Sequence, residues 1–338
     1  MKGLMNILKF GITTVVVLLV LELFLRTTEI APTKYTRIDD TLGLVFRPNA
    51  PLLLLNEGFY LGNINAAGYL GPVRASSEVK RVVLLGDSYV EAFQVFERDH
   101  FATLTQAEFD QKGWDIQLEN RGMSGFDLGQ MYCRYLQTVV ETTPELTVFF
   151  MAPEDFAVAY QVLSPMPQLT PEGALRISYP LERNSGISIR KQLENNFIYT
   201  SSTFTLLSNC RKLVAEGQWR TILFDKLAPT AETVEGVPNK ETVAAPPLSD
   251  LAIKILEDLA GKPIAFATLK PYPPALRAQL EKLNFPIIDL MPEVDALRKQ
   301  GIDPQYWEAT NEQGHYNQQG HAAISQSLVR QLPALITN

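Results

Sequence analysis

Short, mostly apolar runs alternate with helical patterns over most of this 338-residue chain, and this alternation constrains the fold more than any other feature. The runs are residues 82–85, 116–118, 146–151, 264–269 and 285–290. Such runs are typical of strands that are buried on both faces. Because helical segments lie between them, they predict an α/β fold with three layers, α/β/α, around a parallel, flavodoxin-like sheet.

Between the runs, apolar residues recur at the spacing of an α-helix. The clearest stripe follows an i, i+3, i+4, i+7 pattern and consists of Ala252, Ile255, Leu256 and Leu259. Two further stripes repeat every four residues and consist of Tyr132, Leu136 and Val140, and of Ile324, Leu328 and Leu332. These stripes predict the helices that cover the sheet.

Residues 1–26 have a different character, because an apolar run from position 10 to 25 follows Lys2 and Lys9. The segment is long enough to span a bilayer as one helix. It resembles either a cleaved signal peptide or an uncleaved anchor, and we favour the anchor because no small-residue cleavage site follows. The charge bias places the N-terminus in the cytoplasm, which predicts a single-pass protein of the cytoplasmic membrane with its main domain outside. Glu22 is costly in lipid, so we expect it near the outer interface or against another helix.

Three parts of the chain are therefore predicted: an anchor at 1–26, a turn-rich lead-in at 27–80 that packs on the domain, and an α/β domain at 81–338. Two stretches interrupt the domain. Residues 164–218 contain aromatic residues and either form a lid over the strand ends or pack against the domain. Residues 227–247 are rich in Pro, Thr, Ala, Glu and Val, which predicts a mobile loop.

Composition narrows the range of partners. The formal charge is −7 and no basic face alternates with aromatic residues, so nucleic acid is not expected as a partner. Cys133 and Cys210 are the only cysteines, too few for a disulfide framework or a cysteine zinc site. The two thiols are either separately buried, which we favour, or joined in one bridge. We also find no glycine-rich phosphate loop and no metal-ligand spacing, so no cofactor or metal is predicted.

A serine follows the first run directly, in the sequence Gly86-Asp87-Ser88. A serine at this place lies at the ligand-binding edge of the sheet, and Gly86 permits a tight turn before it. This is suitable geometry for a nucleophile. The same tripeptide is also an ordinary turn, and both Asp and Ser commonly cap helices.

A second element lies at the far end of the chain, where residues 314–321 read Gly-His-Tyr-Asn-Gln-Gln-Gly-His before the last helical stripe. Together with Ser88, this segment resembles the SGNH (GDSL-like) hydrolase family. The resemblance implies that Ser88 is the nucleophile, His315 the base, Asn317 the residue at the helix entry and His321 a packing residue. His100, the third histidine, has no expected catalytic role.

The resemblance covers most of the chain from about residue 39 onward. Residues 40–43, 48–49 and 65–71 are similar to the lead-in of extracytoplasmic members of the family. Residues 120–126, Asn-Arg-Gly-Met-Ser-Gly-Phe, are similar to its second conserved block. That similarity implies that the backbone N–H groups of Gly125 and Ser88 form the oxyanion hole, although the glycines also suit a plain strand-to-helix turn.

Two positions depart from the family pattern. Glu154 stands where the family usually supplies an Asn side chain, so the resemblance assigns it to the oxyanion hole with Ser88 and Gly125. An ionised carboxylate cannot donate a hydrogen bond, so Glu154 serves there only if it is protonated, or else another donor replaces it. Upstream of His315, where the family places an Asp, this chain has Glu312 and Gln313. Of the two, we expect Glu312 to orient the imidazole and to stabilise its charge.

The resemblance implies a serine esterase or O-acyltransferase that acts through an acyl-enzyme. Its expected partner is an acylated carbohydrate or another small ester, with an O-acetyl group on an extracytoplasmic glycan as the favoured substrate. The alternative is a membrane-anchored binding or assembly module that keeps the fold without turnover. The residues give no indication of the oligomeric state.

Overall fold

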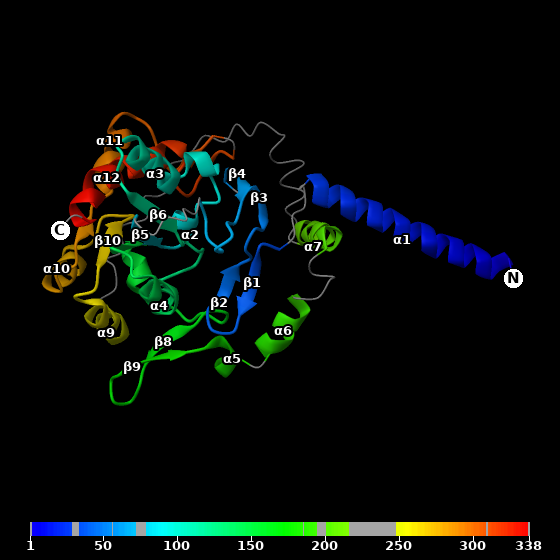
Figure 1. The fold of residues 1–338 in the computed structure, drawn as a ribbon, viewed down its shortest axis with the longest axis horizontal. Coiled ribbons are helices and arrows are strands. Elements are labelled where there is room, and N and C mark those ends of the chain that lie inside the picture. The colour runs from blue at the N-terminus through cyan, green and yellow to red at the C-terminus, as the bar shows by residue number, and fades with distance from the viewer. Residues whose placement is uncertain are drawn as a thin grey trace. The chain divides into compact units, whose positions relative to one another are not determined.

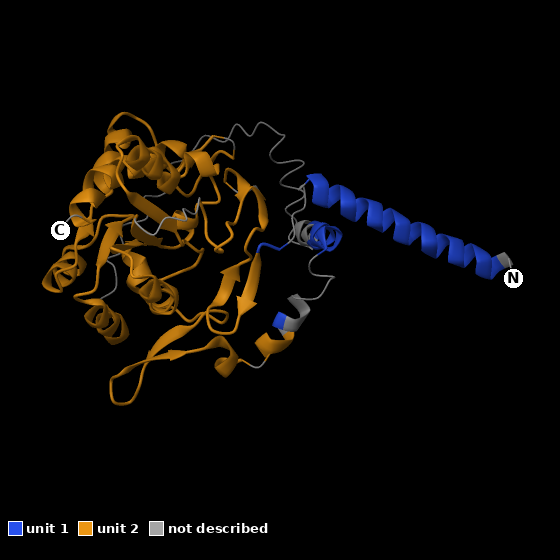
Figure 2. Ribbon diagram, viewed as in Figure 1, with its two compact units in different colours: residues 1–35, 190–244 blue, residues 36–189, 245–338 orange. Residues whose placement is uncertain are grey.

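The computed structural model describes residues 2–28, 34–55, 57–71, 79–184, 186–194, 201–215, 248–308 and 310–336. The chain divides into two compact units (Figure 2). The first combines residues 1–35 with 190–244, and the second combines 36–189 with 245–338. In this division, the part of the 164–218 insertion from residue 190 onward belongs to the same unit as the N-terminal helix.

The second unit contains a five-stranded sheet in the order β11-β10-β7-β5-β6 (Figure 1). Its strands are β5 (Lys80–Leu85), β6 (Ile116–Asn120), β7 (Leu146–Met151), β10 (Ile264–Thr268) and β11 (Ile287–Ile288). All four pairings are parallel, so the predicted sheet is confirmed. The chain passes from β5 to β6 on one side and then to β7 on the other. Ligands bind at such a reversal, beyond the carboxyl ends of the strands.

Helices cover both faces of the sheet (Figure 1). One face carries α3 (Phe101–Gln111), α11 (Met291–Lys299) and α12 (Gln318–Ile336), and the other carries α4 (Leu128–Arg134) and α9 (Asp250–Leu259). The remaining helical segments of the sheet region are α2 (Ser88–Glu91), η1 (Glu97–Asp99), η2 (Tyr135–Val139), η3 (Val140–Thr142), η4 (Pro153–Phe156) and α10 (Pro274–Lys282). The three-layer α/β/α prediction is therefore confirmed.

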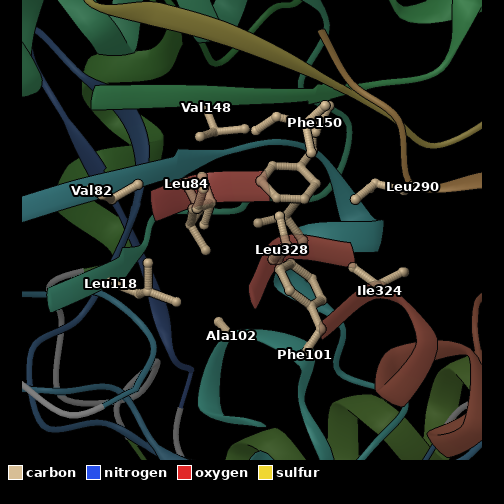
Figure 3. Packing of buried hydrophobic residues seen from close by; sticks show 14 of the residues in the cluster. Val82, Leu84, Phe101, Ala102, Leu118, Val148, Phe150, Leu290, Ile324 and Leu328 are labelled. Carbon is tan, nitrogen blue, oxygen red and sulfur yellow. The ribbon is translucent and has the colours of Figure 1, made fainter. Parts of the chain in front are cut away.

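A hydrophobic core lies between the sheet and the α3–α12 layer (Figure 3). Alternate strand residues such as Val82, Leu84 and Val148 meet Phe101 and Leu328 there, and all five are fully buried. The intervening strand residues are buried as well, as the apolar runs predicted. This burial on both faces holds the strand ends, and the loops that follow them, in fixed positions.

The lead-in forms two antiparallel hairpins on the second unit. They are β1 (Thr36–Asp39) with β2 (Gly43–Phe46), and β3 (Pro51–Leu55) with β4 (Phe59–Asn63). A third short hairpin, β12 (Tyr306–Trp307) with β13 (Glu312–Gln313), lies just before α12 in the sequence. These hairpins are too short to give a strong periodic signal in the sequence.

Within the 164–218 insertion, a β-hairpin packs against the domain. Strand β8 (Met166–Leu169) pairs with β9 (Leu175–Ser178) and contacts α4 and α9. The short helices α5 (Pro180–Arg183) and α6 (Gly186–Glu194) follow. The loop predicted at 227–247 lies outside the described residues.

The first unit contains α1 (Lys2–Thr28) and α7 (Ser202–Ala215). Within the described ranges, α1 is the one helix long and apolar enough to cross a membrane, which is compatible with an anchor or a signal sequence. Glu22 accepts hydrogen bonds from the Ser201 hydroxyl at 2.7 Å and from the N–H groups of Ser202 and Thr203 at 3.0 and 2.9 Å. The expectation that Glu22 contacts another helix is confirmed, because these groups form the start of α7.

Both cysteines are free thiols. Cys133 is buried in α4, as favoured, but Cys210 is exposed on α7. The expectation of a second buried thiol was wrong, and the alternative of a bridge is not realised.

Candidate active site

Ser88 begins α2 at the point where the chain leaves β5. Asp87 caps this short helix, and its carboxylate accepts a hydrogen bond from the N–H of Tyr89 at 2.9 Å. Gly86 makes the turn possible because a Cβ there would lie 2.2 Å from the Val90 side chain. The turn leaves the Ser88 hydroxyl half-buried at the edge of the sheet.

His315 reaches Ser88 from the other end of the chain. Its Nε2 lies 2.8 Å from the Ser88 Oγ, within the range for direct proton transfer. Asn317 fixes the loop between β13 and α12: its Oδ1 accepts hydrogen bonds from the N–H groups of Gln319 and Gly320, both at 3.1 Å. The expected place of Asn317 at the helix entry matches this contact.

Glu57 supplies the carboxylate on the other side of the imidazole. Its Oε1 lies 2.8 Å from His315 Nδ1, and its Oε2 accepts a hydrogen bond from the His315 backbone N–H at 2.7 Å. A carboxylate at Nδ1 holds the ring proton there, which leaves the Nε2 lone pair free to accept the serine proton. Ser88, His315 and Glu57 are thus connected in one chain of hydrogen bonds.

This geometry corrects the expected acid. Glu312 is exposed on β13, a strand that pairs with Tyr306–Trp307, and the carboxylate at Nδ1 belongs to Glu57 instead. Gln313, the other residue considered, donates a hydrogen bond to Asp303 at 2.7 Å. The physical reason is that Glu312 and Gln313 are fixed in the β12–β13 hairpin by their pairing with Tyr306 and Trp307. The β3–β4 turn instead brings Glu57 to the imidazole.

The turn that carries Glu57 is packed closely against the histidine loop. The N–H of Phe59 donates to the Gln94 carbonyl at 3.0 Å, and the buried Trp307 donates from Nε1 to the His315 carbonyl at 2.9 Å. A Cβ at Gly58 would lie 2.3 Å from the Trp307 ring, and one at Gly314 would lie 2.3 Å from the Glu57 carboxyl carbon. Glycine at these two positions therefore permits the contact between Glu57 and His315.

Two backbone N–H groups at the predicted oxyanion-hole positions have no acceptor within the described part of the chain. In the loop after β6, the N–H groups of Arg121, Gly122, Met123 and Phe126 all have internal acceptors. The N–H groups of Ser88 and Gly125 have none among the residues that the structure describes. Gly125 has a φ of +80°, a conformation that glycine adopts without strain. These are the two donors that the sequence resemblance assigned to an oxyanion hole.

Glu154 does not have the role expected for it. It lies on η4, directly after β7, but its side chain is 56% exposed and forms an ion pair with Lys270. A carboxylate paired with a lysine accepts hydrogen bonds and donates none. This arrangement therefore provides no side-chain donor at position 154.

The other two histidines are structural. His321 Nδ1 accepts a hydrogen bond from the Phe101 N–H at 3.1 Å, and His100 caps α3 by accepting from the Ala102 N–H at 3.0 Å. Burial lowers the pKa of His100 to about 4 and that of His321 well below its usual value. Both rings are therefore neutral at physiological pH, and the packing role expected for His321 agrees with its position.

A buried carboxyl group links the serine helix to the loop that carries Gly125. Glu91 lies one turn after Ser88, is 6% exposed, and accepts hydrogen bonds from the hydroxyl and backbone N–H of Ser124. Burial raises the pKa of Glu91 to about 7. Burial, together with the charge of Asp87, also raises the pKa of Asp155 to about 7.

Among the described residues, no group of three or more His, Cys, Asp or Glu side chains is arranged to hold a metal ion. The site described above consists of a serine, a histidine, a glutamate and backbone N–H groups.

No protein-family model and no curated protein matches the sequence. Among solved structures, the chain is similar to an α/β hydrolase from the metagenome of Lake Arreo, Spain, with 14% identity, a TM-score of 0.39, and coverage of 76% of this chain and 96% of that one. It is also similar to the psychrotrophic esterase EstA from Pseudoalteromonas, with 11% identity, a TM-score of 0.39, and coverage of 77% and 100%. An acetyl xylan esterase matches with 13% identity, a TM-score of 0.37, and coverage of 73% and 97%.

Other matches include lipolytic proteins of the G-D-S-L family, the family that the motifs of this chain resemble. At these identities and TM-scores the likeness does not identify a substrate. The assignment of an activity therefore depends on the geometry of the site.

Proposed function

We propose that this protein is a serine esterase or O-acyltransferase. The observation that carries the proposal is the continuous chain from Ser88 Oγ through the His315 imidazole to the Glu57 carboxylate, with both distances at 2.8 Å. A nucleophile hydrogen-bonded to a base, which is itself oriented by a third group, is the arrangement that activates a serine.

In the proposed reaction, His315 Nε2 takes the Ser88 proton as Oγ attacks the carbonyl carbon of an ester. The N–H groups of Ser88 and Gly125 donate to the oxyanion that forms, and Glu57 stabilises the imidazolium. His315 then gives the proton to the departing alkoxide, which leaves an acyl group on Ser88. In the second half of the reaction, water in a hydrolase or a sugar hydroxyl in a transferase attacks the acyl carbon, His315 takes the acceptor's proton, and the bond to Ser88 Oγ breaks as that proton returns to Ser88.

The proposed substrate is an O-acyl group, with O-acetyl favoured, on a glycan outside the cytoplasmic membrane. The apolar α1 and the basic residues near its start support that location. Protease added to spheroplasts should then digest the main domain while the N-terminus stays in the membrane fraction. A protected main domain would contradict the proposed orientation.

A second candidate is a module with this fold that binds a ligand without turnover. The absence of a side-chain donor at Glu154 favours it, since removing one oxyanion donor typically lowers turnover about a hundred- to a thousandfold. A fluorophosphonate probe separates the two candidates. The esterase should be labelled on Ser88, and Ser88→Ala should abolish labelling. A folded wild-type protein without label would support the binding module.

A further inference from the structure

A pocket of about 100 Å³ lies between the β1–β2 hairpin and the loop that follows β6. Its lining includes Arg37, Tyr69, Arg121, Gly122, Phe126 and Arg134. One water molecule needs only roughly 10–15 Å³ by the same kind of measure, so the pocket has room for a group of several atoms. The pocket therefore brings three positive charges together, and each of them needs a countercharge.

Arg134 is the least balanced of the three. It is 8% exposed on α4, and its Nη2 donates to the carbonyls of Leu44 and Leu42 at 3.1 and 3.4 Å. Among the described residues, no carboxylate lies within ion-pair distance of it. Burial lowers the pKa of Arg134 to about 10, so the guanidinium stays charged at neutral pH. A buried charge without a countercharge is costly and therefore uncommon.

Arg121 adds an unused donor. Its Nη2 pairs with Glu119 at 2.6 Å, its Nη1 donates to the Thr138 carbonyl at 2.9 Å, and its guanidinium stacks 4.2 Å from the centre of the Tyr69 ring. Its Nε is buried and has no partner among the described residues. Arg37 pairs with Asp39 at 3.3 Å. Three arginines and two carboxylates leave one positive charge in excess.

We propose that this pocket binds a small oxyanion, namely a carboxylate or a phosphate group. A guanidinium presents its donors in a planar fork that matches both groups. The aromatic rings beside Arg121 and Arg134 hold the two guanidinium planes in place, since Phe126 lies 5.4 Å from Arg134. A bound anion would neutralise the excess charge and use the free donors.

The pocket is connected to the active site by the loop after β6. Gly122 and Met123 line it, and the Met123 N–H donates to the Gly86 carbonyl, two residues before the nucleophile, at 3.0 Å. The anion can therefore come from either of two sources. It is a charged substituent of the ester substrate, or it is a free anion that stiffens the loop carrying Gly125.

Binding is tested on the full-length protein in detergent by titrating inorganic phosphate and acetate at constant ionic strength and following the melting temperature. The wild type should show a saturable rise, because a ligand that binds the native state stabilises it. Arg134→Gln should abolish the rise, and Arg37→Gln should weaken the apparent affinity several-fold. Arg277→Gln removes a surface arginine that is paired with Glu281, and it should behave like the wild type.

The absence of a saturable rise in the wild type would overturn the proposal, as would an equal rise in Arg134→Gln. If Arg134→Gln fails to fold, the same titration of Arg37→Gln tests the proposal instead. That variant should fold, because the Arg37 side chain is only half-buried. The same titration of Ser88→Ala keeps this result separate from the proposed activity, because binding does not require turnover.

Two acetyl esters, one neutral and one bearing a carboxylate, distinguish the sources. If the anion belongs to the substrate, Arg134→Gln should raise KM for the charged ester at least tenfold more than for the neutral ester, and phosphate should compete with the charged one. If the anion is free, phosphate should change the rates of both esters by the same factor. Identical behaviour of Arg134→Gln and Arg277→Gln in every assay would count against the site.

Discussion

The Glu57 carboxylate lies 2.8 Å from His315 Nδ1, although 258 residues separate the two along the chain. Glu57→Gln keeps the shape of the side chain but removes the charge that stabilises the imidazolium. We expect kcat for a small acetyl ester to fall by about a hundred- to ten-thousandfold, the range over which loss of a triad acid acts. Steady-state kinetics and circular dichroism together would show a loss of turnover in a folded protein.

Glu312→Gln is the matched control, because it makes the same change at an exposed residue of β13, three positions before His315. Its kcat should stay near that of the wild type. A large loss in Glu312→Gln with none in Glu57→Gln would reverse the assignment of the acid.

Ser88 and His315 should act as one unit. Either alanine substitution should remove nearly all ester hydrolysis, and the double variant should be scarcely slower than either single one, because each removes the same proton-transfer step. The rates of all three variants should be compared with the uncatalysed reaction. Partial and multiplicative losses would indicate two structural residues that do not share a mechanism.

Gly314→Ala tests the contact that brings the acid to the base. Its Cβ would lie 2.3 Å from the Glu57 carboxyl carbon, so the glutamate must move away from His315. We expect turnover to fall toward that of Glu57→Gln while the core remains folded. Gly11→Ala in α1 is an informative comparison, since a Cβ there meets nothing within 4 Å and the backbone is helical. Unchanged turnover in Gly314→Ala would show that Glu57 is not needed in this position.

Glu91 should make stability depend on pH. Burial raises its pKa from 4.5 to about 7, so between these values the unfolded chain releases a proton that the native protein keeps. The free energy of unfolding should therefore fall as pH rises through this window, by on the order of 3 kcal/mol for Glu91. Burial raises the pKa of Asp155 to about 7 as well, so its contribution has the same sign.

Glu91→Gln removes one of these two contributions. Denaturant unfolding at pH 5 and pH 7.5 should show a smaller loss of stability in Glu91→Gln than in the wild type. An equal loss in both proteins would mean that Glu91 is ionised in the native state at pH 5.

The resemblance of two short segments to the SGNH family predicted the pairing of Ser88 with His315, and the local pattern around each residue was consistent with it. Ser88 directly follows a buried run, and His315 directly precedes a helix with a clear apolar stripe, so each lies at a predictable edge of an element. The sheet was predictable for the same reason, because burial on both faces leaves a continuous apolar run.

Glu57 could not be identified in this way. Its only local signal is a charged residue beside Gly58, between the apolar strands β3 and β4, which is typical of any hairpin turn. Its contact with His315 depends on how the hairpin docks, through Phe59 on Gln94 and Gly58 on Trp307. Neither periodicity nor spacing along the chain encodes such a contact. The exposure of Glu154 and its ion pair with Lys270 could not be predicted for the same reason.

The three residues of the proposed catalytic triad are held by two different parts of the fold. Ser88 and His315 are held by the core of the sheet and by α12, while Glu57 is held by a two-stranded hairpin outside that sheet. Because the hairpin is not hydrogen-bonded to that sheet, it can open locally at a lower free energy than the core does. On gradual heating, the enzyme should therefore lose its acid through local opening before the sheet melts, and inactivation should occur at a lower temperature than global unfolding.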